Sequence, residues 1–172
     1  IWNAFRLVKG WQVAEGEQPE ANAIAAKWFE AKLKQTNAEV NDLFSKYRIS
    51  EALMAVYKLF WDEFSSWYLE MVKPAYGSPI DATTYNQTLS FFETLLKMLH
   101  PFMPFITEEL WQHIFDRNEG ESIMRAELKL DAPSDEDNAI VNAIESVKQI
   151  VGGVRTVRHQ KNIPNKDALE LQ

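Results

Sequence analysis

The sequence has no cysteine, only six glycines among 172 residues, and no long apolar run. Without cysteine, disulfide frameworks and thiolate chemistry are excluded, and a cytoplasmic location is the simpler expectation. No segment approaches the ~18 consecutive apolar residues of a membrane span, so we expect no contact with a membrane. The scarcity of glycine, with most of the seven prolines at apparent joints, favours long helices.

Constellations of catalytic residues are also missing. The three histidines, His100, His113 and His159, do not stand at the spacing of metal ligands. The carboxylates of Glu108 and Glu109 fall in the first turn of an expected helix, where the helix dipole already explains them. The glycine pair at 152–153 lies late in a helix, which is the wrong end for binding a phosphate. We therefore expect no catalytic site, metal site or cofactor site within these residues.

Apolar residues recur every three or four positions along most of the chain, which predicts an all-α antiparallel bundle of about five to six helices. Residues 117–133 form the one segment with an irregular or strand-like pattern. We expect a bundle domain over residues 1–133, and over 134–172 a long helix and the start of a C-terminal junction element. The six helices are expected at 1–14, 19–47, 50–73, 81–99 and 102–115, and from Ser134 onward.

Four of these helices have a well-defined apolar stripe, and each stripe is an expectation about the core. For the second helix the inward positions are Ala25, Phe29, Leu33, Thr36, Val40, Phe44 and Tyr47. For the third they are Leu53, Val56, Phe60, Phe64, Trp67 and Met71, and for the fourth Leu89, Phe92, Leu96 and Leu99. In the last helix the apolar face is Ile140, Ile144, Val147, Val151 and Val154, and the glycines at 152–153 indicate a packing contact or a hinge.

The net charge is −7, but its distribution is uneven. Residues 131–145 contain five acids and no base, residues 146–166 contain five bases and no acid, and residues 1–14 contain two bases and no acid. Local basic faces on an acidic body suit a protein that contacts a polyanion at chosen places. Solvated helices also segregate charge without such a role, so this pattern alone leaves both readings open.

Cationic and aromatic side chains occur together in the manner of an RNA-binding surface. On a helical wheel Trp2, Asn3, Arg6 and Lys9 share the face opposite the apolar positions of the first helix. Aromatic rings and guanidinium groups stack on unpaired RNA bases, and polar groups bind the exposed base edges. Further candidates are Lys27 with Trp28, at the expected edge of the core, and a row of bases for phosphate contact, Arg155, Arg158 and Lys161.

Three motifs, in order, resemble segments of the anticodon-binding domains of class I aminoacyl-tRNA synthetases. Their residues are most similar to those of the valyl enzymes. The first residues resemble the Trp-Asn-Ala-x-Arg segment that follows the catalytic domain of those enzymes. Residues 61–68 resemble their Trp-x-Glu-Phe-Cys-Asp-Trp-Tyr helix, with two serines in place of Cys-Asp. The third motif is the double-proline corner, His100-Pro101-Phe102-Met103-Pro104-Phe105.

The resemblance implies a helical domain that docks the anticodon stem-loop of tRNA-Val in a valine–tRNA ligase. The full-length enzyme would attach valine to its tRNA with ATP for protein biosynthesis, and this domain would pack with its own catalytic domain. Trp2 and Trp28 would stack on bases, Arg6 and Lys9 would contact a base or a phosphate, and the basic row of the last helix would contact the backbone.

Two departures and two alternatives accompany this resemblance. Ser122-Ile123-Met124 is followed by Arg-Ala where the family commonly has Trp-Pro, and Lys27-Trp28 is a loose match to the family's Arg-Trp. The equivalent domain of an isoleucyl or leucyl enzyme is one alternative. The other is a helical protein-interaction or scaffold domain, for which an exposed apolar patch would be the decisive feature.

Overall fold

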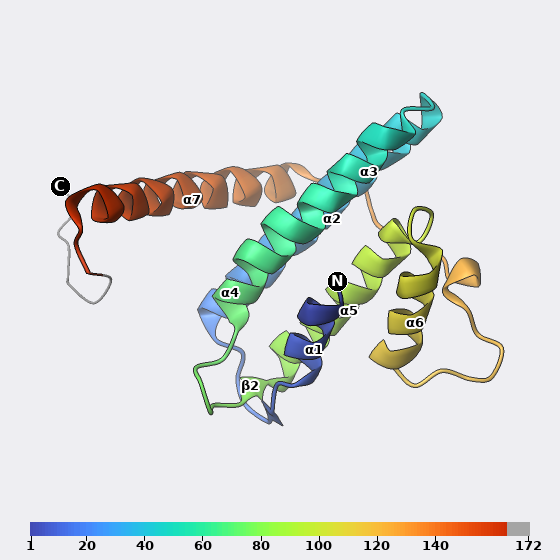
Figure 1. Cartoon of the computed structure of the whole chain (residues 1–172), viewed down its shortest axis with the longest axis horizontal. Helices are drawn as coiled ribbons and strands as arrows, with labels where there is room; N and C mark the ends of the chain where they lie inside the picture. Colours follow the sequence, from blue (N-terminus) through green and yellow to red (C-terminus); the bar gives the residue numbers. More distant parts are fainter. Residues whose placement is uncertain (165–172) are drawn as a thin grey trace.

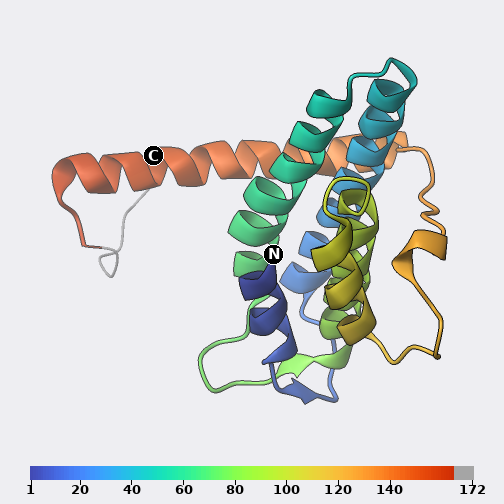
Figure 2. The same cartoon turned by 45° about the vertical axis from the view of Figure 1, so that its right-hand side comes forward.

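The computed structural model describes residues 1–164 and shows an antiparallel helical bundle from which one long helix extends (Figures 1 and 2). Three long rods, α2, the continuous rod α3–η1–α4, and α5, run alternately up and down, and α6 returns along α5. In chain order the elements are α1 (Trp2–Lys9), β1 (Val13–Ala14), α2 (Glu20–Ser45), α3 (Ile49–Lys58), η1 (Leu59–Tyr68), α4 (Leu69–Val72), β2 (Ile80–Asp81), α5 (Ala82–Leu99), α6 (Pro104–Ile114), η2 (Ile123–Arg125) and α7 (Asp135–Lys161). The all-α prediction is confirmed.

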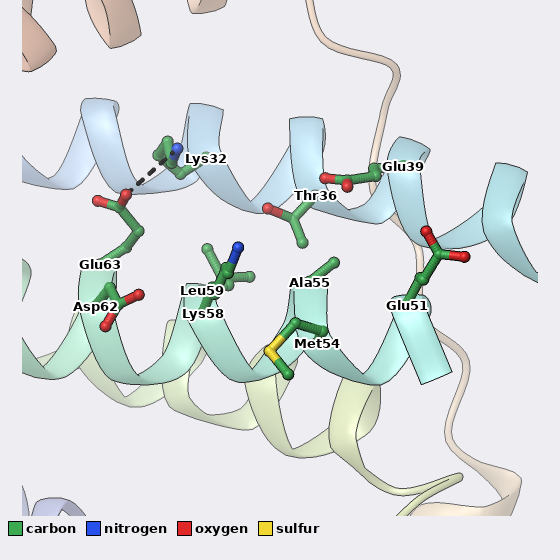
Figure 3. A pocket seen from close by; sticks show the side chains of 10 residues that line it. All are labelled: Lys32, Thr36, Glu39, Glu51, Met54, Ala55, Lys58, Leu59, Asp62 and Glu63. Carbon is green, nitrogen blue, oxygen red and sulfur yellow. Dashed lines mark ion pairs between the residues drawn. The ribbon is translucent and has the colours of Figure 1, made fainter. Parts of the chain in front are cut away.

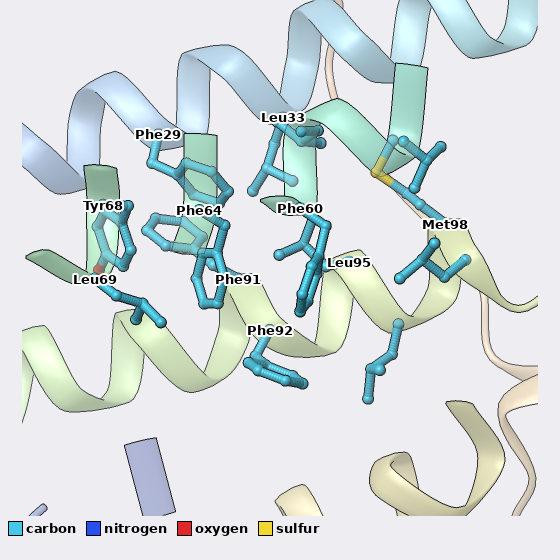
Figure 4. Packing of buried hydrophobic residues seen from close by; sticks show 14 of the residues in the cluster. Phe29, Leu33, Phe60, Phe64, Tyr68, Leu69, Phe91, Phe92, Leu95 and Met98 are labelled. Carbon is cyan, nitrogen blue, oxygen red and sulfur yellow. The ribbon is translucent and has the colours of Figure 1, made fainter. Parts of the chain in front are cut away.

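The core is a layer of aromatic rings between α2, the rod and α5 (Figure 4). The Phe29 ring lies 5.2 Å from the Phe64 ring and 5.3 Å from the Phe91 ring, and Phe92 packs edge-on against Phe60 and Phe64. Such edge-on and tilted pairs add about 0.5–1.5 kcal/mol each beyond the burial of their area. This layer fixes the spacing of the three rods.

The middle of the rod, η1, is a π-helix, whose hydrogen bonds run from each residue to the fifth one along. The hydroxyls of Ser65 and Ser66 donate to the carbonyls five residues before them, at 2.9 and 2.8 Å. The wider turn brings residues four apart nearly into line, so Phe64 stacks on Tyr68 with ring centroids 5.6 Å apart. The sequence prediction placed Trp67 in the buried stripe, but the wider turn buries Tyr68 in its place and leaves Trp67 half-buried.

The Tyr68 hydroxyl lies in the core and shares a 2.9 Å hydrogen bond with Thr88 of α5. Burial raises the pKa of Tyr68 to about 12, since the charged phenolate would lose its hydration there. At the start of α5, the Asp81 side chain accepts from the Thr84 backbone N–H at 2.7 Å and so caps the helix where the sequence pattern placed its start. All four predicted inward residues of α5 are buried.

Other predicted boundaries are wrong at particular residues. The first helix ends at Lys9, and Val13–Ala14 pair in parallel with Ile80–Asp81, a long-range contact that the local pattern did not indicate. The α2 helix ends at Ser45, and Tyr47 is exposed in a left-handed conformation, with φ of 58°, instead of continuing the buried stripe. Leu53 of the rod is also exposed.

The irregular segment 117–133 is held against α6 by one carboxylate. Glu108 accepts hydrogen bonds from the Ser122 hydroxyl at 2.7 Å, the Ile123 backbone N–H at 3.1 Å and the Gln112 amide at 2.7 Å. Burial alone would raise the pKa of Glu108, but these three donors outweigh it, and the pKa lies below its usual value. The α6 helix itself begins at Pro104, two residues after the predicted start at 102, with the proline in its first turn.

The long helix α7 starts with a reciprocal cap. The Ser134 hydroxyl accepts from the Asp137 N–H at 3.1 Å, and the Asp137 carboxylate accepts from the Ser134 N–H at 2.8 Å, which confirms the predicted start. The first half of α7 packs on α2, while Figure 1 shows its second half extending away from the bundle. Gly152 and Gly153 lie within the continuous helix, and within residues 1–164 no atom from outside the helix's own backbone would come within 4 Å of a Cβ at either. The glycine pair is therefore not a packing contact.

The predicted start of a further element after Pro164 lies outside the described residues. Within residues 1–164 no helix has the length and apolarity that a membrane span requires.

We expect Glu108→Gln to lower the free energy of unfolding at pH 7 by about 1–3 kcal/mol, because a neutral amide accepts these bonds less well and leaves donors unsatisfied. A carboxyl with a depressed pKa stabilises the fold above its unfolded-state pKa of about 4.3, and this stabilisation is lost as the pH falls through the folded-state value. The variant should therefore lose less stability than the wild type between about pH 5 and pH 3. Urea unfolding at a series of pH values measures both effects.

Glu109→Gln is the matched control, because Glu109 is the exposed neighbour, and within residues 1–164 its side chain pairs with His113 alone, one turn along. Its unfolding free energy should stay within about 0.5 kcal/mol of the wild type. Equal pH profiles for Glu108→Gln and the wild type would contradict the role given to Glu108.

Candidate nucleic-acid interface

The exposed face of α1 is as the sequence predicted. Phe5 and Val8 are buried against the core, and Trp2, Asn3, Arg6 and Lys9 are all exposed. The helix has no acidic residue, and apart from the exposed Trp2 and Leu7 its polar and apolar residues lie on different faces. The amphipathic pattern therefore places two cations, an amide and an indole on one solvent-facing surface.

The Trp2 ring is exposed but supported from below. It is 42% exposed and lies on Phe5 with ring centroids 5.7 Å apart, and Phe5 packs in turn on Phe92 of α5 at 6.0 Å. A ring held on one side and open on the other is the arrangement that stacking on an unpaired base requires. The structure thus gives Trp2 the position that its predicted role needs.

The two cations of α1 are held by neutral partners. Arg6 donates from Nη2 to the Asn3 side-chain oxygen at 3.0 Å, and the Lys9 ammonium donates to the carbonyl of Ile114 at 3.3 Å, at the end of α6. Within residues 1–164 neither forms an ion pair with a carboxylate, so the positive charge of this face is not neutralised by a neighbour. The guanidinium of Arg6 therefore lies beside the Asn3 amide on the exposed face.

Trp28 is not at the edge of the core, and that prediction is wrong. Its side chain is 1% exposed, packed against Phe29, and covered by the ammonium of Lys148 at 4.6 Å from the ring centroid. Trp28 therefore has no open ring face for a base. Lys27, the residue before it, is exposed on the surface of α2.

The three basic residues predicted to form a row on α7 have different surroundings. The Arg155 guanidinium lies over the Trp67 ring at 5.5 Å, and Arg158 donates to the carbonyl of Pro164 at 2.6 Å. Lys161 is exposed in the last turn of the helix. In both views the far end of α7 lies well away from α1, so the structure does not join the two basic groups into one patch (Figures 1 and 2).

A groove of about 450 Å³ between α2 and the rod has mainly acidic residues among the charged groups of its lining, in contrast to the basic face of α1 (Figure 3). Four carboxylates line it against two ammonium groups, and Lys32 is paired across it with Glu63 at 3.5 Å. Its acids disfavour a polyanion there. Within residues 1–164 no three His, Asp or Glu side chains come together in a way that could hold a metal ion.

A family model described as the anticodon-binding domain of tRNA ligase matches residues 26–172. The chain belongs to this family. Over its whole length it is also 66% identical to a valine–tRNA ligase of Phocaeicola vulgatus and 68% identical to one of Parabacteroides distasonis. A valine–tRNA ligase of Enterococcus faecalis is 34% identical over 99% of the chain. The chain spans about a fifth of the length of these relatives.

These matches support the family that the three motifs indicated. The α1 helix lies before the region matched by the family model, but the two most similar of these relatives align with all of it. Sequence reasoning missed one residue of this anticodon-binding domain, the buried Lys148, since it was counted only as part of the basic end of α7. Its position within an otherwise apolar stripe, facing an aromatic-rich helix, was the signal available.

We expect Trp28→Ala to lower the unfolding free energy by about 3–5 kcal/mol, because it empties a fully buried ring site. Trp2→Ala should cost less than about 1 kcal/mol, since much of that ring is already in water. Urea unfolding of the two variants measures the difference. A similar loss for both would contradict the placement of Trp28 in the core and Trp2 at the surface.

Proposed function

We propose that this domain docks the anticodon stem-loop of tRNA-Val through the exposed face of α1. The observation that carries the proposal is the combination on one surface of an open indole, Trp2, and two cations, Arg6 and Lys9, that pair with no carboxylate within residues 1–164. Trp2 and Arg6 would stack on or bind splayed bases, and Asn3 would offer its amide to a base edge. Lys27 and the end of α7 would contact phosphates, which adds affinity without sequence preference.

The whole protein would be a valine–tRNA ligase that joins valine to its tRNA with ATP in the cytoplasm. The support is the name shared by relatives that align with the whole of this chain at 66% and 68% identity. ATP and valine would bind in the remaining four-fifths of such a protein, which includes the catalytic domain. The division of this chain at residue 133 into a bundle and a junction stays a prediction. The valyl name of the relatives favours valine over isoleucine or leucine.

A second candidate function is a protein contact through the outer face of the rod. Ile49, Leu53, Tyr57 and Trp61 are exposed at four-residue spacing, and the Tyr57 and Trp61 rings stack with centroids 6.0 Å apart. Because Glu51 and Asp62 lie beside this row, it suits a protein surface better than RNA. The rest of the full-length chain is the partner that we favour, and this contact is compatible with tRNA binding through α1.

We expect Arg6→Ala in the full-length enzyme to weaken binding of tRNA-Val by about 1–3 kcal/mol and to reduce its preference over a tRNA with an altered anticodon. Filter binding of both tRNAs measures this. Lys58→Gln, an exposed cation on α3 away from α1, is the matched control and should bind as the wild type does. An unchanged preference in Arg6→Ala would show that Arg6 does not read a base.

We expect Lys161→Ala to weaken binding of both tRNAs alike and to reduce the slope of log affinity against log salt by about 1, because it removes one phosphate contact. Titrations at two or more salt concentrations measure the slope. Loss of preference with no change in slope would contradict a backbone contact at Lys161.

A further inference from the structure

Lys148 is a charged residue buried where α7 crosses the bundle. Its side chain is 8% exposed, and its ammonium forms a short ion pair with Glu63 of η1 and a longer one with Glu145 of α7, at 3.7 Å. Glu63 is shared, since its other oxygen pairs with Lys32 of α2 at 3.5 Å. Figure 3 shows this Lys32–Glu63 pair spanning α2 and η1. One carboxylate therefore connects α2, η1 and α7.

Two indole rings complete the surroundings of this ammonium. It lies 4.6 Å from the Trp28 ring centroid and 5.4 Å from that of Trp67. Two turns further along α7, Arg155 contacts the same Trp67 ring at 5.5 Å. A cation is attracted to the face of an indole ring, most strongly where water is excluded, and this attraction helps to offset the cost of burying the ammonium. We call Lys148, Glu63, Trp28 and Trp67 the Lys148 clasp.

Beyond the clasp α7 has little support from the bundle. Ile150 and Val157 are exposed, and the helix projects outward from this point (Figures 1 and 2). From Lys148 to Lys161 the helix rises about 20 Å, so a tilt of ten degrees at the clasp displaces its end by roughly 3 Å. A displacement of this size is enough to move an ammonium out of contact with a phosphate.

We propose that Lys148 is a positioning residue for tRNA binding, which fixes the direction in which α7 leaves the bundle. Through the clasp it places Arg158 and Lys161 where the RNA backbone passes. The inference rests on the proposed phosphate contacts of these two residues.

A buried ion pair suits this role better than an apolar side chain would. Apolar packing alone tolerates small rotations and slips of a helix, and a buried ion pair contributes little net stability. The ammonium of Lys148 reaches Glu63 and both indoles only in one rotation and one register of α7. A wrong register would leave the ammonium buried without a partner, so the clasp penalises every other arrangement.

The first test is hydrogen exchange in the full-length enzyme. In Lys148→Gln the amides of α7 near residues 141–148 should exchange about tenfold faster, because that part of the helix loses its attachment, while the amides of α5 keep their protection. Glu63→Gln should produce the same change from the other side of the pair. Lys148→Arg, which keeps the charge and its contact with the indoles, should restore most of the protection, and Lys58→Gln should exchange as the wild type does. Unchanged exchange of α7 in both Lys148→Gln and Glu63→Gln would overturn the inference.

The second test is the coupling of Lys148 to the end of α7 in tRNA binding. Lys148→Gln should raise the dissociation constant about three- to tenfold, and this effect should disappear in the Arg158→Ala/Lys161→Ala background, because those groups are then absent. If Lys148→Gln raises the dissociation constant by the same factor in this background as in the wild type, Lys148 acts independently of Arg158 and Lys161, and the inference is overturned.

The same measurement separates the two proposals. If Arg158→Ala/Lys161→Ala alone leaves tRNA affinity unchanged, the phosphate contacts of α7 are rejected and the positioning role falls with them. If that double variant binds weakly while Lys148→Gln binds as the wild type does, the proposed function stands and only the inference is rejected.

Discussion

The structure depends on the fact that α2 must bury two sides. Trp28 and Phe29 are adjacent, and helical geometry points their rings in different directions, yet both are almost completely removed from water. Phe29 packs into the aromatic layer against the rod and α5, while Trp28 is covered by Lys148 of α7. Small buried residues on neighbouring turns of α2, such as Ala25, Ala26 and Ala31, let the adjacent helices approach closely on both sides. The bundle without α7 would leave the Trp28 side of α2 in water.

Sequence reasoning succeeded where the chemistry is local and failed where burial depends on distant residues, as it does on this second side of α2. Helix starts set by side-chain caps were predictable, since Asp81 and Ser134 act on backbone groups within a few residues. Trp28 was misplaced because its burial depends on a helix more than a hundred residues away. Tyr68 is buried where Trp67 was predicted to be, because the wider turns of η1 rotate the side chains around the helix axis. A buried stripe drawn at α-helical spacing does not include that rotation.

The candidate interface was predictable to the extent that it is local. Trp2, Asn3, Arg6 and Lys9 belong to one short helix, and the wheel of a short helix needs no tertiary information. The hydrogen bond of Lys9 to the end of α6 and the contact of Arg155 with Trp67 are long-range, and the sequence held no sign of them. Much of the acidic surface is engaged in pairs within the fold, such as Glu93 with Arg117 and Asp137 with Lys34, so overall charge describes the surface poorly.

The glycines at 152 and 153 have a mechanical consequence for the arm that α7 forms. They come just after the last buried residue of the helix, and no neighbour fills the space that a methyl group would occupy at either. Each glycine weakens the helix by about 1 kcal/mol relative to alanine, and here no compensating contact is gained. The helix is nevertheless continuous across the pair, so it carries the direction set at Lys148 through to Lys161, and alanine at either position would strengthen this stretch without a clash.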